Sequence, residues 1–437
     1  MKNVISGMAY FFATALAVLI ILMIIATLNM QRLGFTENET DGYDELNELN
    51  LPELDGEKMT DLLSPSQQTG KSDKSDKTND NSGGNTDGEY LNNSNPGDNI
   101  APVFNVNSVA YAGDLELPVN GASGYASVDM EMFLEDLTSV TLKAGTAFTV
   151  IEELTGADAG WWQISVNGIT GTVRHILCMI NLPDVIPSII YNNANAYKSV
   201  FRAGGKDIPN ITGRILYSYS DAFDKYSGKA YNPRFQRYEY IVPVLYSMSK
   251  RICAAQKNAL ENGDTLVIYE GFRPAETQQL VYKEVQALAG SDAEVRRTLN
   301  SGSWSIGWFI ASGTSNHQEG YAIDTTLGRV VSTEDMSAGD YKYVKVKNYY
   351  EYGMPTDIHD LGSDAAVYTG PYSRTYTAAM NESENAKALQ KYCTDAGLST
   401  LASEWWHFND EYTRSSMPRR GNGRYEIKEC VSIPPTA

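Results

Sequence analysis

Two of the four histidines sit in polar surroundings that suit a metal ion. His317 and Asp324 lie seven positions apart with a glycine between them, and His407 closes a Glu-Trp-Trp-His run. The glycine lets the chain bend, so that the first two side chains can face one point. Imidazole nitrogens and carboxylate oxygens both bind zinc, at about 2.0–2.2 Å. Three protein ligands with one open position define a catalytic zinc site, so we expect a catalytic zinc ion here.

A carboxylate stands close to the third of these ligands in the sequence. Glu404 lies three residues before His407. Zinc lowers the pKa of its bound water to near 7, and peptide hydrolysis then needs a carboxylate that takes the water's proton and passes it to the leaving amine. We expect Glu404 to do this. The sequence contains no His-Glu-x-x-His motif, which excludes a thermolysin-like helix.

The two runs together form a pattern of known enzymes. They read Ser315-x-His317-x(6)-Asp324 and Glu404-Trp-Trp-His407. This pattern resembles the zinc D,D-peptidases, the family of D-alanyl-D-alanine dipeptidases and carboxypeptidases. The resemblance covers about residues 200–410.

Further runs resemble the dipeptidase branch of that family. They are the Glu-Trp-Trp-His-Phe form of the second motif, Glu270-Gly-Phe-Arg273-Pro274 and Met354-Pro-Thr356. After Met-Pro-Thr, that branch tends to continue x-Phe-Asp, whereas this chain has Asp-Ile-His359. The substrate contacts of this region are therefore left open by the sequence.

The resemblance implies a role for each matching residue. It implies one zinc ion per chain, with the ligands His317, Asp324 and His407. Glu404 would be the general base and acid. Arg273 would stabilise the developing oxyanion, a task that suits a fixed guanidinium, and its alternative is a structural ion pair. Ser315 would lie near the substrate or the zinc site.

The other two histidines carry weaker signals. His175 lies in a β-rich region, and we interpret it as an ordinary structural histidine. His359 is either a pocket residue that supports the ligands or an ordinary surface histidine. The Tyr-rich stretches 340–352 and 368–376 would form a lid or an altered rim.

Charge and cysteine content exclude other classes of protein. The chain has 54 acidic and 35 basic residues, a net charge of -19, which argues against binding to nucleic acid and against electrostatic capture by anionic wall polymers. Residues 33–100 hold 16 acidic residues against 4 lysines. The four cysteines form no Cys-x-x-Cys pair and are too few for a disulfide framework. We interpret them as small buried hydrophobes, and one disulfide bridge outside the cell is the alternative.

The N-terminal part predicts a membrane anchor and a tether. Residues 8–28 form an uncharged apolar run of 21 residues, long enough to cross about 30 Å of hydrocarbon as a helix. We favour an uncleaved single-pass anchor (1–32) over a signal peptide, because no small-residue cleavage site follows the run. The acidic segment 33–102 lacks large apolar side chains over most of its length and is expected to be a disordered linker.

Residues 103–182 predict a small all-β barrel. Residues 141–151 and 160–166 read as strands, and the first run is broken by a glycine turn. Asn167-Gly168 predicts a two-residue hairpin. The order of these features resembles bacterial SH3 domains, which often bind wall peptides but in other cases only pack against a neighbouring domain.

Residues 183–437 predict an α+β domain. Helices are expected over 241–262, about 275–288 and 384–396, with a buried strand at 265–269. Helices and strands alternate without a regular βαβ repeat, which indicates an α+β fold.

The parts combine into one functional expectation. The anchor, tether and SH3-like module favour a wall-bound substrate outside the cell membrane, because tethering raises local concentration. We therefore expect a D,D-carboxypeptidase that acts on peptidoglycan stem peptides. Hydrolysis of free D-Ala-D-Ala is the nearest alternative. Cleavage elsewhere in the stem, such as L-Ala-D-Glu, and a non-catalytic wall-binding protein are the alternatives. An intact Glu404 argues against the last.

Overall fold

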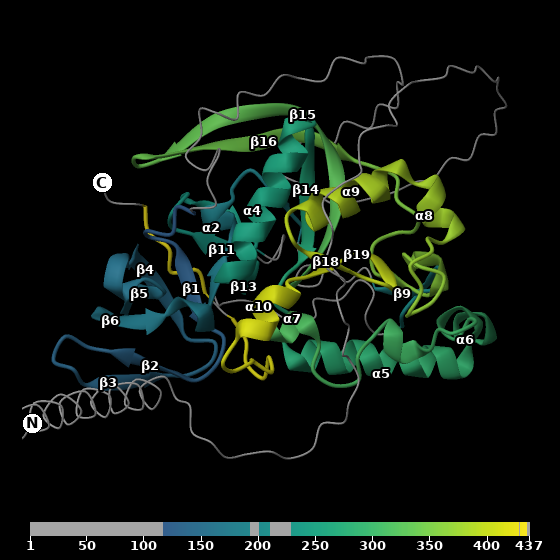
Figure 1. Cartoon of the computed structure of the whole chain (residues 1–437), viewed down its shortest axis with the longest axis horizontal. Coiled ribbons are helices and arrows are strands. Elements are labelled where there is room, and N and C mark those ends of the chain that lie inside the picture. The colour runs from purple at the N-terminus through teal and green to yellow at the C-terminus, as the bar shows by residue number, and fades with distance from the viewer. Residues whose placement is uncertain (1–116, 193–200, 210–228, 428, 435–437) are drawn as a thin grey trace, which may run out of the picture. The chain divides into compact units, whose positions relative to one another are not determined.

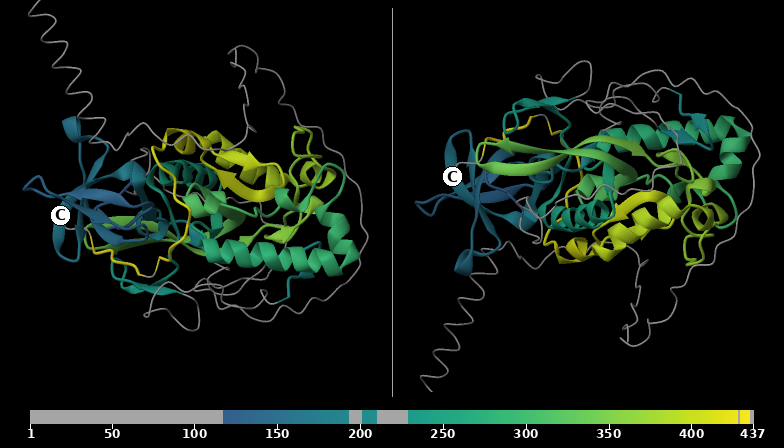
Figure 2. Two further views of the ribbon diagram at one scale, coloured as in Figure 1. Left: turned by 90° about the horizontal axis from the view of Figure 1, so that it is seen from below. Right: turned by 90° about the horizontal axis from the view of Figure 1, so that it is seen from above.

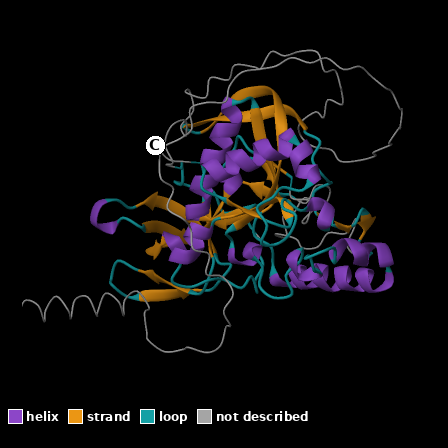
Figure 3. Cartoon of the chain, turned by 45° about the vertical axis from the view of Figure 1, so that its right-hand side comes forward, coloured by secondary structure: helices purple, strands orange, loops and turns teal. Residues whose placement is uncertain are grey.

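The computed structural model describes residues 117–192, 201–209, 229–427 and 429–434. The predicted anchor and linker lie outside these residues. Within the part that the structure describes, no helix combines the length and the apolar character needed to cross a membrane. Strands and helices are interspersed along this part (Figure 1, Figure 3).

The first sheet is antiparallel and contains eight of the described strands. Their order is β13-β7-β1-β4-β5-β6-β2-β3. The bounds are β1 (Ser123–Ala126), β2 (Met130–Phe133), β3 (Ser139–Leu142), β4 (Ala147–Glu153), β5 (Trp161–Val166), β6 (Ile169–Arg174), β7 (Cys178–Asn181) and β13 (Pro243–Leu245). Figure 1 shows β1 to β6 gathered around one another at one end of the described part.

The turn residues expected from the sequence delimit these strands. Asn167 and Gly168 have φ angles of 51° and 82°, and the ladder closes across Val166 and Ile169, so the predicted two-residue hairpin is confirmed. Gly145, at φ 84°, lies between β3 and β4, where a glycine turn was expected. Alternate apolar side chains are buried inside: Met130, Met132, Phe148, Val150, Trp162, Ile164 and Val173. That the strands form an SH3-type barrel stays a prediction.

This sheet continues across residue 182, where the sequence predicts a domain boundary. β7 pairs with β13, in the register Ile180↔Val244. The C-terminal residues 429–433 also bond to the β1 region: the Ile433 amide donates to the Gly121 carbonyl at 2.7 Å. One hydrophobic core joins side chains from both sides of the boundary. The β-rich part is therefore packed into the rest of the described chain.

The second sheet contains six described strands. Their order is β18-β19-β15-β14-β8, and β16 pairs with β15. The bounds are β8 (Ile190–Tyr191), β14 (Asp264–Glu270), β15 (Ala322–Ala338), β16 (Tyr341–Glu351), β18 (Ser399–Leu401) and β19 (Glu404–Asn409). β14, β15 and β19 are antiparallel neighbours, and β15 and β16 form the long hairpin at the top of Figure 1.

Helices flank this sheet. Figure 2 shows α5 on one side of the strands and α9 on the other. The α-helices are α2 (Leu182–Val185), α4 (Tyr246–Glu261), α5 (Ala275–Ser291), α6 (Ala293–Leu299), α7 (Asn316–Glu319), α8 (Ala378–Glu382), α9 (Glu384–Asp395) and α10 (Glu411–Ser416). Five short strands remain: β9 (Arg202–Ala203), β10 (Lys206–Asp207) and β17 (Asp360–Leu361) form one sheet, and β11 (Ala230–Asn232) pairs with β12 (Arg237–Glu239) before β13.

The predicted helix over 241–262 begins too early. α4 starts at Tyr246, because Pro243–Leu245 is the strand β13 on the edge of β7. The other two helices and the buried strand occur where they were expected, within a few residues. The Tyr-rich stretch 340–352 is mostly β16, paired along β15, and its role as a lid or an altered rim stays a prediction.

The four cysteines, all within the described residues, are unpaired. Cys178, Cys253 and Cys393 are buried, and Cys430 is partly buried. Burial raises the pKa of the Cys253 thiol to about 12, so this side chain stays a protonated, apolar filler at neutral pH.

Candidate metal centre

A short capped helix presents the first histidine. His317 lies in α7, whose N-cap is Ser315. The Ser315 hydroxyl accepts the His317 amide at 3.3 Å, and the Ser315 amide donates to the Gln318 side chain at 2.6 Å. This capping box accounts for the Ser315 position before the histidine, because it orients the first turn of the helix. Ser315 also lines the pocket described below.

A glycine reverses the chain between the histidine and the aspartate. Gly320 ends α7 at φ 81°, the left-handed conformation that the sequence required of a bend. A Cβ built at Gly320 would lie 2.9 Å from the Met179 Sδ atom, so a side chain has no room there. The chain then enters β15, where Asp324 is the third residue.

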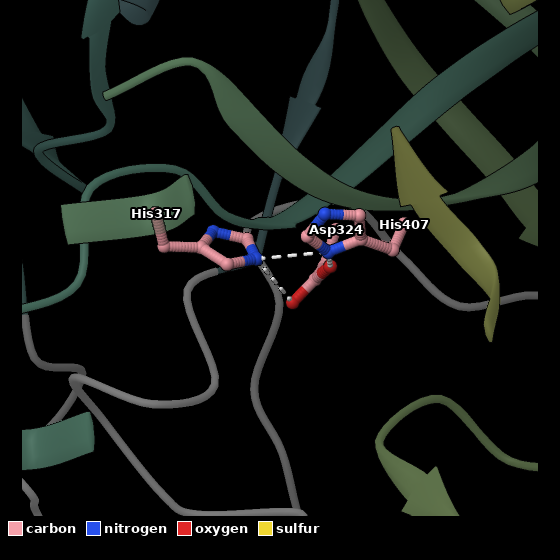
Figure 4. A group of neighbouring side chains, drawn as sticks. All are labelled: His317, Asp324 and His407. Carbon is pink, nitrogen blue, oxygen red and sulfur yellow. Dashed lines mark hydrogen bonds and ion pairs between the residues drawn. The ribbon is translucent and has the colours of Figure 1, made fainter. Parts of the chain in front are cut away.

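Pairing between two strands adds the second histidine. Asp324 on β15 stands opposite His407 on β19. The His407 Nδ1 atom lies 3.0 Å from Asp324 Oδ1 and 3.1 Å from His317 Nε2, and His317 Nε2 lies 3.3 Å from Asp324 Oδ2 (Figure 4). All three side chains are buried. The structure thus brings together the three residues that the sequence named as ligands.

The ring orientation of His317 is set by a backbone carbonyl. Its Nδ1 atom lies 2.8 Å from the Gly271 carbonyl oxygen. A carbonyl oxygen only accepts, so Nδ1 carries the proton. In the neutral ring, Nε2 is then bare, and its lone pair points toward Asp324 and His407.

Two side-chain amides fix the orientation of the His407 ring in a similar way. The His407 Nε2 atom lies 2.8 Å from Asn409 Oδ1, which also accepts the Asn316 amide group at 2.8 Å. The Tyr321 hydroxyl donates to Asn316 Oδ1 at 2.6 Å, which orients that amide. The His407 proton is therefore on Nε2, and the bare Nδ1 of the neutral ring faces Asp324.

The arrangement fits a tetrahedral metal ion. Two imidazole lone pairs and one carboxylate converge on one point, and these groups repel one another unless a cation lies between them. Ligand atoms of tetrahedral zinc at about 2.0–2.1 Å from the metal are about 3.3 Å apart. The separation of 3.1 Å between the two imidazole nitrogens is close to this value, and each nitrogen lies 3.0 or 3.3 Å from one of the two Asp324 oxygens. The donor set of two neutral imidazoles and one carboxylate is one that zinc accepts.

The charges at the centre favour a cation as well. Burial lowers the pKa of His317, so this ring is neutral. Burial alone would raise the pKa of Asp324, but its contacts with His317, His359 and His407 hold it well below its usual value. Asp324 is therefore ionised at neutral pH. Burial also opposes charge on His407, but the contact with Asp324 outweighs it and raises the His407 pKa, so a proton and a metal ion compete for His407 Nδ1.

A buried arginine stands behind the aspartate. Arg273 Nη2 lies 3.4 Å from Asp324 Oδ2 and also contacts the carboxylate of Glu270, while Arg273 Nη1 donates to Gln278 Oε1 at 2.7 Å. Glu270, Asp324 and His359 form a second group of potential ligands. The Arg273 guanidinium contacts both carboxylates of that group and supplies the positive charge that balances them, so this second group does not need a metal ion. Both expected readings of Arg273 thus have support: it has an ion-pair partner, and it lines the pocket.

Glu404 is buried on the strand that carries His407. Its Oε2 atom lies 3.8 Å from His407 Nδ1. Burial, with a contribution from Asp324, raises the Glu404 pKa to about 8, and His407 and Arg273 oppose the rise. A carboxyl group with a pKa near neutrality can both accept and return a proton.

These groups open into one pocket of about 200 Å³. Its polar wall includes Arg273, Ser315, His359 and Glu404 in addition to the three candidate ligands. Its apolar wall is formed by Phe201, Trp308, Phe309, Ile310, Leu361, Leu401 and Trp406. The pocket is large enough for one or two small side chains beside the metal centre.

The second Tyr-rich stretch lies at the rim. Tyr368 and Tyr376 face each other in an isolated bridge, with stacked rings 5.6 Å apart. Between them, Tyr372 is 77% exposed and contacts Trp308 edge-to-face at 5.6 Å. Trp308 lines the pocket, so this loop contacts the pocket wall, and its role as a lid or an altered rim stays a prediction.

Sequence reasoning left some contributors without a role. Asn409, which orients His407, lies two residues after it on the same strand, and the period of two in a strand could have indicated it. Gly271 contributes a carbonyl, which no side-chain pattern reveals. His359 proves to be buried beside Asp324, whereas His175 lies away from the pocket, next to Glu153.

Comparison with known proteins does not extend these observations. No protein-family model matches the chain, and no curated protein matches it.

Proposed function

We propose that this protein is a zinc metallopeptidase that hydrolyses the D-alanyl-D-alanine bond at the end of cell-wall stem peptides. One observation carries the metal part: the hydrogen bonds to Gly271 and Asn409 leave the bare nitrogens of His317 and His407 facing an ionised Asp324. The resemblance of the two motifs to zinc D,D-peptidases supports the choice of bond.

Each remaining group has a place in hydrolysis. When bound, zinc supplies a water of lowered pKa and polarises the scissile carbonyl. Glu404 would serve as the general base and acid that accepts a proton from water and returns it to the leaving amine, a role that a carboxyl group with a pKa of about 8 can fill. Arg273, fixed by Glu270 and Gln278, directs positive charge at the pocket, where it stabilises the developing oxyanion. The apolar wall excludes bulk water from these charges.

The proposed substrate is attached to the wall rather than free. The predicted anchor and linker would hold the catalytic part outside the cell membrane, close to peptidoglycan. Hydrolysis of the free dipeptide is the nearest alternative, because the motifs resemble the dipeptidase branch. Cleavage of an internal stem bond and wall binding without catalysis remain outcomes of the test.

The test uses the full-length chain in detergent, loaded with zinc. A wall pentapeptide ending in D-Ala-D-Ala and free D-Ala-D-Ala are offered separately, and the products are followed by mass. Release of one D-Ala from the pentapeptide supports the proposal. Cleavage of the free dipeptide alone would replace it with a dipeptidase. Cleavage of neither would refute it and direct attention to internal stem bonds or to binding.

A further inference from the structure

His359 is buried next to the metal centre without belonging to the three candidate ligands. Its Nε2 atom lies 3.0 Å from Asp324 Oδ2, and 1% of the residue is exposed. A carboxylate that ligates zinc is deprotonated and only accepts hydrogen bonds, so the proton of this bond is on His359 Nε2. The histidine therefore donates to the carboxylate oxygen that lies away from His407.

The protein maintains this contact in an unfavourable local state. His359 has a φ of 61°, the left-handed region that residues with a Cβ rarely adopt. Its other nitrogen, Nδ1, is buried without a hydrogen-bond partner. Strained backbone and an unpaired buried polar atom persist where the surroundings enforce them, and such residues cluster at functional sites.

The surroundings do enforce this position. The His359 ring stacks on Phe201, with centroids 4.6 Å apart and planes 13° apart. Its carbonyl accepts the Arg202 amide at 3.0 Å, at the end of the β9–β17 pairing. Ring and backbone are thus held from two sides, which aims Nε2 at Asp324.

We propose that His359 is a positioning residue that holds the Asp324 carboxylate for zinc and thereby sets zinc affinity. The inference rests on the proposed zinc site. Ligating carboxylates need an outer hydrogen bond, and loss of such a partner typically costs 10–100-fold in metal affinity. Arg273 contacts the same oxygen at 3.4 Å but is shared with Glu270, so it does not replace the shorter bond.

Two amide variants separate positioning from packing. In His359→Gln the side-chain nitrogen reaches about as far as Nε2, whereas in His359→Asn it stops near Nδ1. Asparagine tolerates positive φ better than glutamine. The Asn variant should therefore be the more stable of the two in urea and yet the weaker in zinc binding. A purely structural role would place both properties in the same order.

Zinc affinity is measured on the full-length chain by competition with a chromophoric chelator, without substrate. We expect His359→Asn to bind zinc roughly 10–100-fold more weakly than the original chain, and His359→Gln to stay within about threefold. Equal affinity of the Asn variant and the original chain would overturn the inference, as would equal loss in both variants.

A packing control covers the case in which the Gln variant does not fold. Phe201→Leu removes the stacked ring, one of the two restraints on His359, but leaves the His359 donor in place, so it should lower stability and weaken zinc binding by less than His359→Asn does. A loss of zinc affinity equal to that of His359→Asn would overturn the inference. Because no peptide enters these measurements, a failed peptidase assay with normal zinc binding would refute only the proposed reaction.

Discussion

Gly320 forms the bend between the candidate ligands His317 and Asp324. It joins His317 to the strand of Asp324, at φ 81° and with Met179 Sδ 2.9 Å from the place of a Cβ. Gly320→Ala therefore carries two costs. The left-handed conformation costs about 1–2 kcal/mol for an alanine. The steric contact with Met179 adds about 1–3 kcal/mol, because this core side chain is fully buried. We expect a loss of about 2–5 kcal/mol in the free energy of unfolding.

Two other glycines separate these terms. Gly302 has a φ of 60° and nothing within 4 Å of a built Cβ, so Gly302→Ala should show the conformational cost alone, about 1–2 kcal/mol. Gly307 lies in open space without a positive φ, and Gly307→Ala should change stability by less than about 0.5 kcal/mol. Urea unfolding of the three variants, with the zinc content of each, measures both effects. If Gly320→Ala were no less stable than Gly302→Ala, the argument from the Met179 contact would be refuted.

Three further changes test the chemistry and the electrostatics. Glu404→Gln should lower the rate of peptide hydrolysis by roughly 10²–10⁴-fold while zinc stays near one per chain by metal analysis; full activity would exclude Glu404 as the base. His317→Ala should lose zinc, and retained metal would show that the ligand assignment is incorrect. Glu351 is mostly buried and accepts the Tyr269 hydroxyl at 3.1 Å, and burial raises its pKa from 4.5 to about 7. The Glu351 carboxyl group therefore binds its proton more tightly in the folded chain than in the unfolded chain. The contribution of this proton to the free energy of unfolding is fully present below pH 4.5 and is lost as pH rises through 7. Glu351→Gln should be more stable than the original chain above pH 7, by at most about 3 kcal/mol, and the difference should vanish toward pH 4.5 in urea unfolding. A difference independent of pH would contradict this.

Local patterns were sufficient for the ligand types and for much of the secondary structure. A histidine, a glycine and an aspartate within eight residues can face one point only if the chain bends at the glycine, and Gly320 does so. Asn167-Gly168 makes a tight turn from its own conformational preferences, and α5 follows from its own apolar spacing. These features depend on neighbours in the sequence, so the sequence alone predicts them.

Contacts between distant segments decided the rest. Pro243–Leu245 fits a helical spacing, but the free edge of β7 pairs with it as β13, because backbone pairing with a distant strand outweighs weak local preference. The proton positions on His317 and His407 depend on Gly271 and Asn409, and only the antiparallel register of β15 and β19 sets Asp324 opposite His407. The sequence alone therefore predicts which residues form the candidate site. The direction of each lone pair and each charge follows from packing that brings residues up to 90 positions apart within 3.1 Å.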